Sequence, residues 1–180
     1  VWIHGGGFEH GFSTELEFDG EAYAKKGVIL VTISYRVNVF GFLYDQKQEE
    51  ELGFSGNQGL LDQIAALEWI HENIAAFGGN PDNITIMGQS AGAMSSHALT
   101  FSPLAAPMIR QAILQSGSIA NFPFPMVFTK AQAQAVTDKF YELCGVSSIE
   151  ELRKLPAEYL LDKSDELMAV YPTAPFRPVV

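Results

Sequence analysis

The chain has 180 residues, of which 47% are hydrophobic, and a formal net charge of −10. This length and composition are typical of a soluble globular domain with one buried core. The acidic balance disfavours nucleic acid as a partner, and no run approaches the ~18 consecutive apolar residues of a membrane-spanning helix. The single cysteine, Cys144, excludes a disulfide within the chain, and no His or Cys cluster has the spacing of metal ligands. We therefore expect no metal, no other cofactor, no nucleic-acid partner and no membrane span.

The first part of the chain predicts two strands on either side of a glycine-rich loop. Residues 1–4 are expected to form a short strand that runs directly into the loop. A short helix over residues 21–26 precedes the β-branched run 28–33, which is typical of a strand buried on both faces of a parallel sheet. Residues 43–56 are polar and predict a loop, with the acidic cluster Glu49-Glu50-Glu51 exposed and without a specific role.

The middle of the chain alternates between helix and strand. Apolar residues spaced four, three, three and four apart predict one face of a helix; they are Leu60, Ile64, Leu67, Ile70 and Ile74. Glycine and proline at residues 78–81 end this helix. A strand over 84–87, a helix to about Thr100 and a buried strand over 112–115 follow. This alternation predicts an α/β fold, a doubly wound, mostly parallel sheet with helices on both faces.

The last part of the chain, about residues 129–170, is predicted to be helical. Two Ser/Thr-x-x-Glu/Gln patterns, Thr129 to Gln132 and Ser148 to Glu151, predict capping boxes. The first helix places Ala133, Val136, Phe140 and Leu143 on one face and ends at Cys144, which we expect to be an inert, buried thiol before Gly145. Pro156 is suited to the first turn of a further helix.

The most informative stretch is Gly88-Gln89-Ser90-Ala91-Gly92, a Gly-x-Ser-x-Gly between the strand 84–87 and a helix. This is the context of a nucleophile elbow, a sharp turn that strains the serine backbone and lifts its hydroxyl above the sheet. Glycine is expected on both sides because a Cβ there would meet neighbouring backbone. The helix begins at the serine, so its free N–H groups are directed at any oxyanion formed beside it.

The glycine-rich loop Gly5-Gly6-Gly7-Phe8 predicts the second half of such a site. In lipases and esterases a loop of this kind supplies backbone N–H groups to an oxyanion hole. A dinucleotide-binding loop is excluded because Gly-x-Gly-x-x-Gly counted from Gly5 ends at His10. A purely structural glycine turn stays an alternative, but the two elements in this order favour a serine hydrolase.

Beyond these two loops the chain resembles the type-B carboxylesterase and cholinesterase-like family of α/β-hydrolases over nearly its whole length. Other segments that carry the resemblance are Ser34-Tyr35-Arg36-Val37, Phe40-Gly41-Phe42-Leu43, Gly56-Asn57-Gln58-Gly59-Leu60, Asp62-Gln63, Asn73-Ile74, Phe77-Gly78-Gly79-Asn80-Pro81 and Gln115-Ser116-Gly117-Ser118. The resemblance implies an α/β-hydrolase fold, present as one partial domain over 1–180, and a small-molecule ester as substrate. It implies Ser90 as the nucleophile and the N–H groups of Gly6, Gly7 and Ala91 as the oxyanion hole. Supporting roles fall to His4, Gly5, Gly88, Gln89 and Gly92.

The acid and the histidine of a catalytic triad are not recognisable in this sequence. In this fold they follow the nucleophile, and the only later histidine, His97, lies seven residues along the same helix, roughly 10 Å away along its axis. A proton acceptor must lie about 3 Å from the hydroxyl. His71 is expected to face solvent, His4 to support the glycine loop, and His10 to approach the site only if its loop folds back.

We therefore expect a fragment, truncated at both ends, that carries the nucleophile and the oxyanion hole and is nearly inactive alone. No secretory leader is visible, but the chain opens within a motif and without a methionine, so this gives no expectation about localisation. The alternative is a non-catalytic binding or adhesion protein on the same scaffold. Gln89 stands where cholinesterases carry Glu, which favours neutral esters over choline esters. The loop Phe122-Pro123-Phe124-Pro125-Met126 resembles an acyl-pocket loop, with plain packing cover as the alternative.

Overall fold

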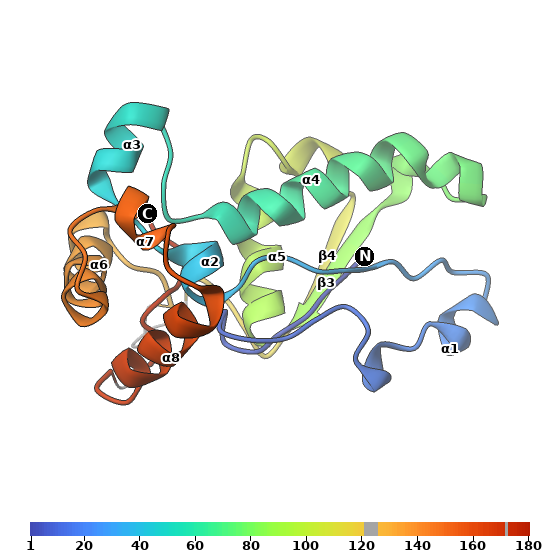
Figure 1. The fold of residues 1–180 in the computed structure, drawn as a ribbon. Helices are drawn as coiled ribbons and strands as arrows, with labels where there is room; N and C mark the ends of the chain where they lie inside the picture. Colours follow the sequence, from blue (N-terminus) through green and yellow to red (C-terminus); the bar gives the residue numbers. More distant parts are fainter. Residues whose placement is uncertain (121–125, 172) are drawn as a thin grey trace. The chain divides into compact units, whose positions relative to one another are not determined.

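A computed structural model describes residues 1–120, 126–171 and 173–180 (Figure 1). The chain divides into two compact units. The first comprises Val1–Tyr35 and Leu60–Met126, and the second comprises Arg36–Gly59 and Val127–Val180. The expectation of one domain over residues 1–180 stays a prediction.

The first unit is built on a four-stranded parallel sheet. Its strands are β1 (Trp2–Ile3), β2 (Thr32–Ile33), β3 (Thr85–Gln89) and β4 (Gln111–Gln115), in the order β2-β1-β3-β4. The parallel arrangement confirms the predicted class of sheet. Ile3 pairs with Gly88 in parallel register, so the glycine loop after β1 and the turn after β3 both begin at the carboxyl-terminal end of the sheet.

The first unit also contains helices. They are α1 (Glu21–Ala24), most of α4 (Gln58–Asn73) and α5 (Ala91–Phe101), with 3-10 turns η1 (Leu16–Phe18), η2 (Ile74–Phe77), η3 (Pro81–Asn83) and η4 (Ala106–Met108). Helix α5 packs on β1, β3 and β4 (Figure 1). Helix α4 buries the predicted stripe through Ile64, Leu67 and Ile70. Gly78, at φ 83°, ends the helical segment as predicted.

Two strands of this unit were predicted to be buried, and that prediction is wrong. Of residues 28–33 only Thr32 and Ile33 form a strand, while Val28 and Ile29 are 50% and 43% exposed. Strand β4 contains the predicted residues 112–115, but all its residues are exposed. Both strands are the outermost members of the sheet, and an apolar run cannot distinguish an outer strand from a central one.

The second unit consists of helices α2 (Asn38–Phe42), α3 (Gln46–Leu52), α6 (Lys130–Cys144), α7 (Ile149–Leu152) and α8 (Ala157–Met168). Helix α8 packs against α6 and α2 (Figure 1). The core of the second unit contains the buried Phe42, Leu160 and Leu167. It also contains an edge-to-face pair of Phe140 and Phe176 with ring centroids 5.2 Å apart.

The prediction of a polar loop over residues 43–56 is wrong, because α3 lies within it. The Asp45 side chain caps α3 by accepting from the Gln48 N–H at 2.7 Å. Glu49, expected to be exposed and without a role, accepts a hydrogen bond from the Tyr44 hydroxyl at 2.8 Å and pairs with Lys130 at 3.0 Å. These two donors, Lys130 foremost, hold the pKa of Glu49 below its usual value.

The predicted start and end of α6 are confirmed, and one of its buried positions is wrong. Thr129 and Gln132 form the full capping box. Leu143 is 37% exposed rather than buried, and Cys144 is buried at the end of the helix, where desolvation raises the pKa of its thiol. This agrees with the inert thiol that we expected.

The second predicted capping box is only half formed. The Ser148 side chain accepts from the Glu151 N–H, but the Glu151 carboxylate accepts from the Ser147 N–H at 2.8 Å instead of the Ser148 N–H. Pro156 directly precedes α8. Among the residues that the structure describes, no helix combines the length and the apolar character needed to cross a membrane.

Candidate active site

Ser90 stands at a strained turn between β3 and α5. Its backbone has φ 55° and ψ −120°, in a region that non-glycine residues rarely adopt, and it is the N-cap of the helix. The Ser90 N–H donates to the Gln115 carbonyl of the neighbouring strand at 2.9 Å. The structure thus has the geometry of a nucleophile elbow, as predicted from the sequence.

Glycine is required on both sides of this turn because main-chain atoms crowd it. A Cβ built on Gly92 would lie 2.0 Å from the Ile3 carbonyl oxygen. A Cβ on Gly88 would lie 2.5 Å from the same oxygen. Real Cβ atoms essentially never come within 3.0 Å of another heavy atom, so both positions exclude every other residue without a shift of the backbone.

The glycine loop lies directly beside the elbow. A Cβ built on Gly5 would be 3.6 Å from the Ser90 Cβ and 2.8 Å from the Gln89 carbonyl oxygen. Gly6 and Gly7 both have positive φ, at 98° and 66°. Only glycine adopts such backbone angles without penalty.

Three backbone donors around Ser90 have no acceptor among the residues that the structure describes. In the described part of the chain the N–H groups of Gly6, Gly7 and Ala91 donate to no backbone or side-chain oxygen. Unpaired N–H groups on a glycine loop and at a helix N-terminus provide a local positive potential. This arrangement can stabilise an anionic oxygen that forms next to Ser90.

His4 contacts the glycine loop through a hydrogen bond to Gly5. It is fully buried, with Nδ1 2.9 Å from the Gly5 carbonyl oxygen, so this nitrogen carries the proton. Its ring stacks on Tyr35 with centroids 4.2 Å apart, and the Tyr35 hydroxyl donates to the His4 carbonyl at 2.9 Å. Burial lowers the pKa of His4 and raises that of Tyr35, so both side chains are neutral near pH 7.

A cavity of about 380 Å³ opens at the loop and the elbow. Its lining consists of Trp2, Gly5, Gly6, His10, Glu15, Glu17, Phe18, Gln89 and Gln115. Its size is within the range of small-ligand sites. The carboxylates of Glu15 and Glu17 place negative charge in its lining, which disfavours anionic ligands by Coulomb repulsion.

The turn after β4 is a part of the site to which sequence reasoning gave no role. A Cβ on Gly117 would lie 2.3 Å from the Ser90 carbonyl oxygen, and Ser116 has φ 55°. The Ser118 hydroxyl is 2.9 Å from Nδ1 of His97. The sequence did contain a signal for this role, since Gly117 follows closely after the predicted strand 112–115. Parallel strands bring their carboxyl ends together, so this turn could have been expected near Ser90.

His4, His10 and His97 lie as the sequence analysis expected, whereas the prediction that His71 faces solvent is wrong in part. Among residues 1–120, 126–171 and 173–180, no imidazole hydrogen-bonds to the Ser90 hydroxyl. His97 bonds to Ser118, His10 lines the cavity beside Gly6, and His71 is half-buried rather than fully solvent-facing. The aromatic and proline residues of the loop 122–126 fall on positions 122–125, outside the described residues.

A parallel sheet with a serine at a strand-to-helix turn, beside a loop of positive-φ glycines, defines a protein of the α/β-hydrolase class. The sequence model of the carboxylesterase family matches residues 1–180. The chain therefore belongs to the carboxylesterase family.

Individual relatives agree with this assignment. Para-nitrobenzyl esterase of Bacillus subtilis (strain 168) is 43% identical over 170 residues, which cover 93% of this chain and 33% of the esterase. Bile salt-activated lipase of Rattus norvegicus is 42% identical, covering all of this chain and 31% of the lipase. The crystal structure of a carboxylesterase from Geobacillus stearothermophilus superposes with a TM-score of 0.87 at 44% identity, over 99% of this chain and 38% of that one. The chain thus spans about a third of the length of these relatives.

Proposed function

We propose that the protein of this chain hydrolyses carboxylic esters through an acyl-enzyme, with Ser90 as the nucleophile. The observation that carries the proposal is the position of Ser90 on a strained helix N-terminus, beside three N–H groups that have no acceptor among the described residues. Ser90 Oγ attacks the ester carbonyl carbon, and the carbonyl oxygen becomes an oxyanion held by Gly6, Gly7 and Ala91. Collapse of this intermediate expels the alcohol, and water then releases the acid from Ser90.

The triad base and acid are proposed to come from outside residues 1–180. No described histidine contacts the Ser90 hydroxyl, and the relatives are about three times as long as this chain. Loss of the base from such a triad lowers turnover by about 10⁶, leaving some 10³ to 10⁴ over water. The 180-residue chain alone is thus expected to be nearly inactive.

The substrate class is proposed to be neutral esters of small molecules. Gln89 is uncharged and lines the cavity, so the residue next to Ser90 adds no attraction for a cationic ester. Glu15 and Glu17 in the same lining repel anionic esters and attract cations, so anionic esters are the class that the lining disfavours most. The names of the relatives, an esterase and a lipase, support ester hydrolysis in general.

A chimera tests the proposal. Residues 1–180 replace the aligned segment of the Bacillus subtilis esterase, which is 43% identical, so that the relative supplies the remaining two thirds. We expect hydrolysis of p-nitrophenyl acetate by the chimera and a fall in turnover of about 10⁶ on Ser90→Ala. Ser102→Ala, at the other end of α5, is the matched control and is expected to leave turnover unchanged.

The outcomes separate the two candidate functions. A folded chimera without Ser90-dependent turnover contradicts the proposal and favours a non-catalytic binding or adhesion protein. Rapid turnover by the 180-residue chain itself, lost on Ser90→Ala, contradicts the proposed location of the base and acid. Circular dichroism of each protein establishes that it is folded.

A further inference from the structure

The Tyr35 side chain lies against the residue from which the glycine loop begins. The pairing of β1 with β2 ends at Ile3 and Ile33, and Tyr35 follows two residues later. Its hydroxyl donates to the His4 carbonyl at 2.9 Å, and its ring stacks on the His4 ring with centroids 4.2 Å apart and planes 14° from parallel. Tyr35 therefore holds both the main chain and the side chain of His4.

His4 in turn contacts the glycine loop and the helix behind it. Its Nδ1 donates to the Gly5 carbonyl at 2.9 Å. Gly11 covers this hydrogen bond, because a Cβ built on Gly11 would collide with the same nitrogen. On the other side, a Cβ built on Gly92 of α5 would lie 2.8 Å from the His4 carbonyl oxygen. The position of His4 thus sets the direction in which the loop leaves β1.

The contact between the two rings is buried. His4 is 0% exposed and Tyr35 is 7% exposed. Burial lowers the pKa of His4 and raises the pKa of Tyr35, so the tyrosine hydroxyl keeps its proton and stays a donor. Loss of this hydroxyl would remove a hydrogen bond from a buried carbonyl, which is costly where water has no access.

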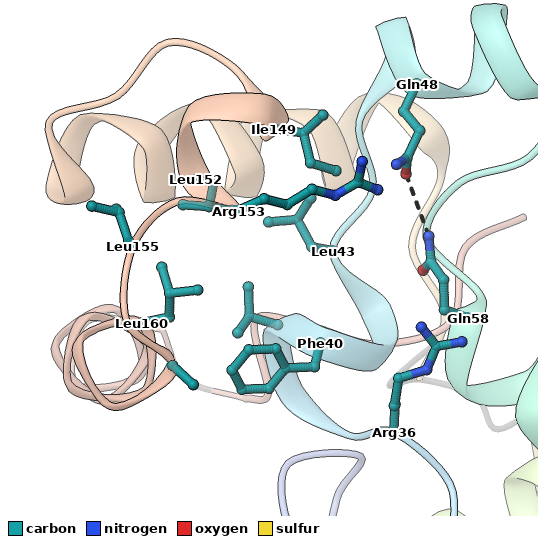
Figure 2. Close-up of a pocket in the computed structure, with 12 residues that line it drawn as sticks. Arg36, Phe40, Leu43, Gln48, Gln58, Ile149, Leu152, Arg153, Leu155 and Leu160 are labelled. Atoms are coloured by element: carbon teal, nitrogen blue, oxygen red, sulfur yellow. Dashed lines mark hydrogen bonds between the residues drawn. The ribbon is translucent and has the colours of Figure 1, made fainter.

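The contacts change at the next residue along the chain. Arg36 begins the second unit and lines a cavity of about 360 Å³ there, together with Phe40 and Gln58 (Figure 2). Neither Tyr35 nor any residue of the proposed active site lines that cavity. The Tyr35 hydroxyl therefore bears on the glycine loop and not on the cavity that follows it in the chain.

We propose that Tyr35 is a positioning residue for the oxyanion hole, an inference that rests on the proposed esterase function. Through His4 it fixes the start of the loop that carries the N–H groups of Gly6 and Gly7. Tyr35 acts through His4 and does not touch the substrate. Oxyanion stabilisation depends steeply on donor geometry, since removal of a single donor lowers turnover by about 10² to 10³.

Tyr35→Phe in the chimera with the Bacillus subtilis esterase tests the proposal. This variant keeps the ring stack and loses the hydroxyl. We expect kcat for p-nitrophenyl acetate to fall about tenfold, which is less than the cost of losing a whole donor. Acylation and deacylation both pass through an oxyanion and slow together, so KM is expected to stay within about twofold of the parent value.

A second measurement follows the oxyanion itself. When Ser90 Oγ adds to a trifluoromethyl ketone, the hydroxyl proton passes to the triad base supplied by the relative, and the ketone oxygen becomes an oxyanion. In Tyr35→Phe the inhibition constant of 1,1,1-trifluoro-2-octanone is expected to rise about tenfold, in parallel with the fall in kcat. The inhibition constant of 2-octanone, which forms no stable adduct, is expected to be unchanged.

Tyr44→Phe is the matched control. Tyr44 is also a buried tyrosine, and its hydroxyl donates to Glu49 at 2.8 Å within the second unit. We expect this variant to keep the kcat of the parent chimera, and circular dichroism establishes that both variants are folded.

The outcomes separate this inference from the proposed function. An unchanged kcat in Tyr35→Phe, a loss expressed in KM alone, or equal losses in the two variants would each overturn the role of Tyr35 and leave the esterase proposal standing. Absence of Ser90-dependent turnover in the folded parent chimera would overturn both.

Discussion

At Gly92 the absence of one methyl group allows the elbow to close. The Ile3 carbonyl of the neighbouring strand occupies the place where a Cβ would be. Because the Ile3 carbonyl is a main-chain group, it cannot rotate away from an added Cβ as a side chain would. Close approach of α5 to β1 therefore depends on this residue type, and the same holds for Gly117 against the Ser90 carbonyl.

Gly92→Ala is expected to lower the free energy of unfolding by about 3 kcal/mol, as for a severely overpacked site. Urea unfolding followed by tryptophan fluorescence measures this, since both Trp2 and Trp69 belong to the first unit. Gly27→Ala is the matched control. Gly27 has φ 73° but open space around it, so only the left-handed backbone is penalised, by about 1 kcal/mol. Equal losses in the two variants would show that the crowding at Gly92 is relieved without cost.

The residues at the centre of the site could be predicted from the sequence because their pattern is dictated by backbone sterics. Gly88, Ser90 and Gly92 adopt the turn expected of Gly-x-Ser-x-Gly. The contributions of Tyr35 and Ser118 could not be predicted in this way. They act through a ring stack and a hydroxyl contact between residues far apart in the chain, which leave no local pattern.

Among the elements, α6 shows how a helix start is defined by its flanking side chains. The Thr129 hydroxyl accepts from the Gln132 N–H at 3.3 Å, and the Gln132 side chain accepts from the Thr129 N–H at 3.0 Å. Two of the donors that a helix leaves unpaired at its start are thereby satisfied.

Thr129→Ala is expected to destabilise the chain by about 1 kcal/mol, the usual cost of removing an N-cap hydroxyl. Far-ultraviolet circular dichroism during urea unfolding measures the loss. Thr129→Ser keeps the hydroxyl and is expected to stay within a few tenths of a kcal/mol of the parent chain. If serine and alanine destabilise equally, the hydroxyl is not what holds the start of α6.

Element predictions failed where polar composition concealed a helix. Helix α3 consists of Gln46–Leu52, a run with three consecutive glutamates, and it was predicted as loop. It is held by Asp45, which caps it and also receives the Tyr141 hydroxyl at 2.8 Å from a segment 96 residues away. Contacts of such separation override local composition, and no sequence window contains them.

On the scale of the whole molecule, β4 is an outer strand with exposed apolar side chains. Among the residues that the structure describes it pairs only with β3, and its Ile113 is 48% exposed. Exposed edge strands of this composition pair with other chains. The net charge of −10 opposes such association by mutual repulsion.

Ile113→Lys is therefore expected to reduce aggregation of the chain on heating, because it places a charge on the open edge of the sheet. Static light scattering during a temperature ramp measures this. Leu16→Lys makes the same change in charge at a residue that is 95% exposed but lies in the 3-10 turn η1. We expect no comparable improvement from it. Equal protection by both lysines would show that the effect does not come from the edge of the sheet.

The backbone of Ser90, the proposed nucleophile, is held in place by peptide groups. The Gln115 carbonyl fixes the serine amide, and the Ile3 carbonyl abuts Gly92. If the proposed role of Ser90 holds, selection or engineering can exchange the side chains of the surrounding cavity while the backbone of Ser90 keeps its place. In such a design the choice of substrate and the capacity for attack evolve independently of each other.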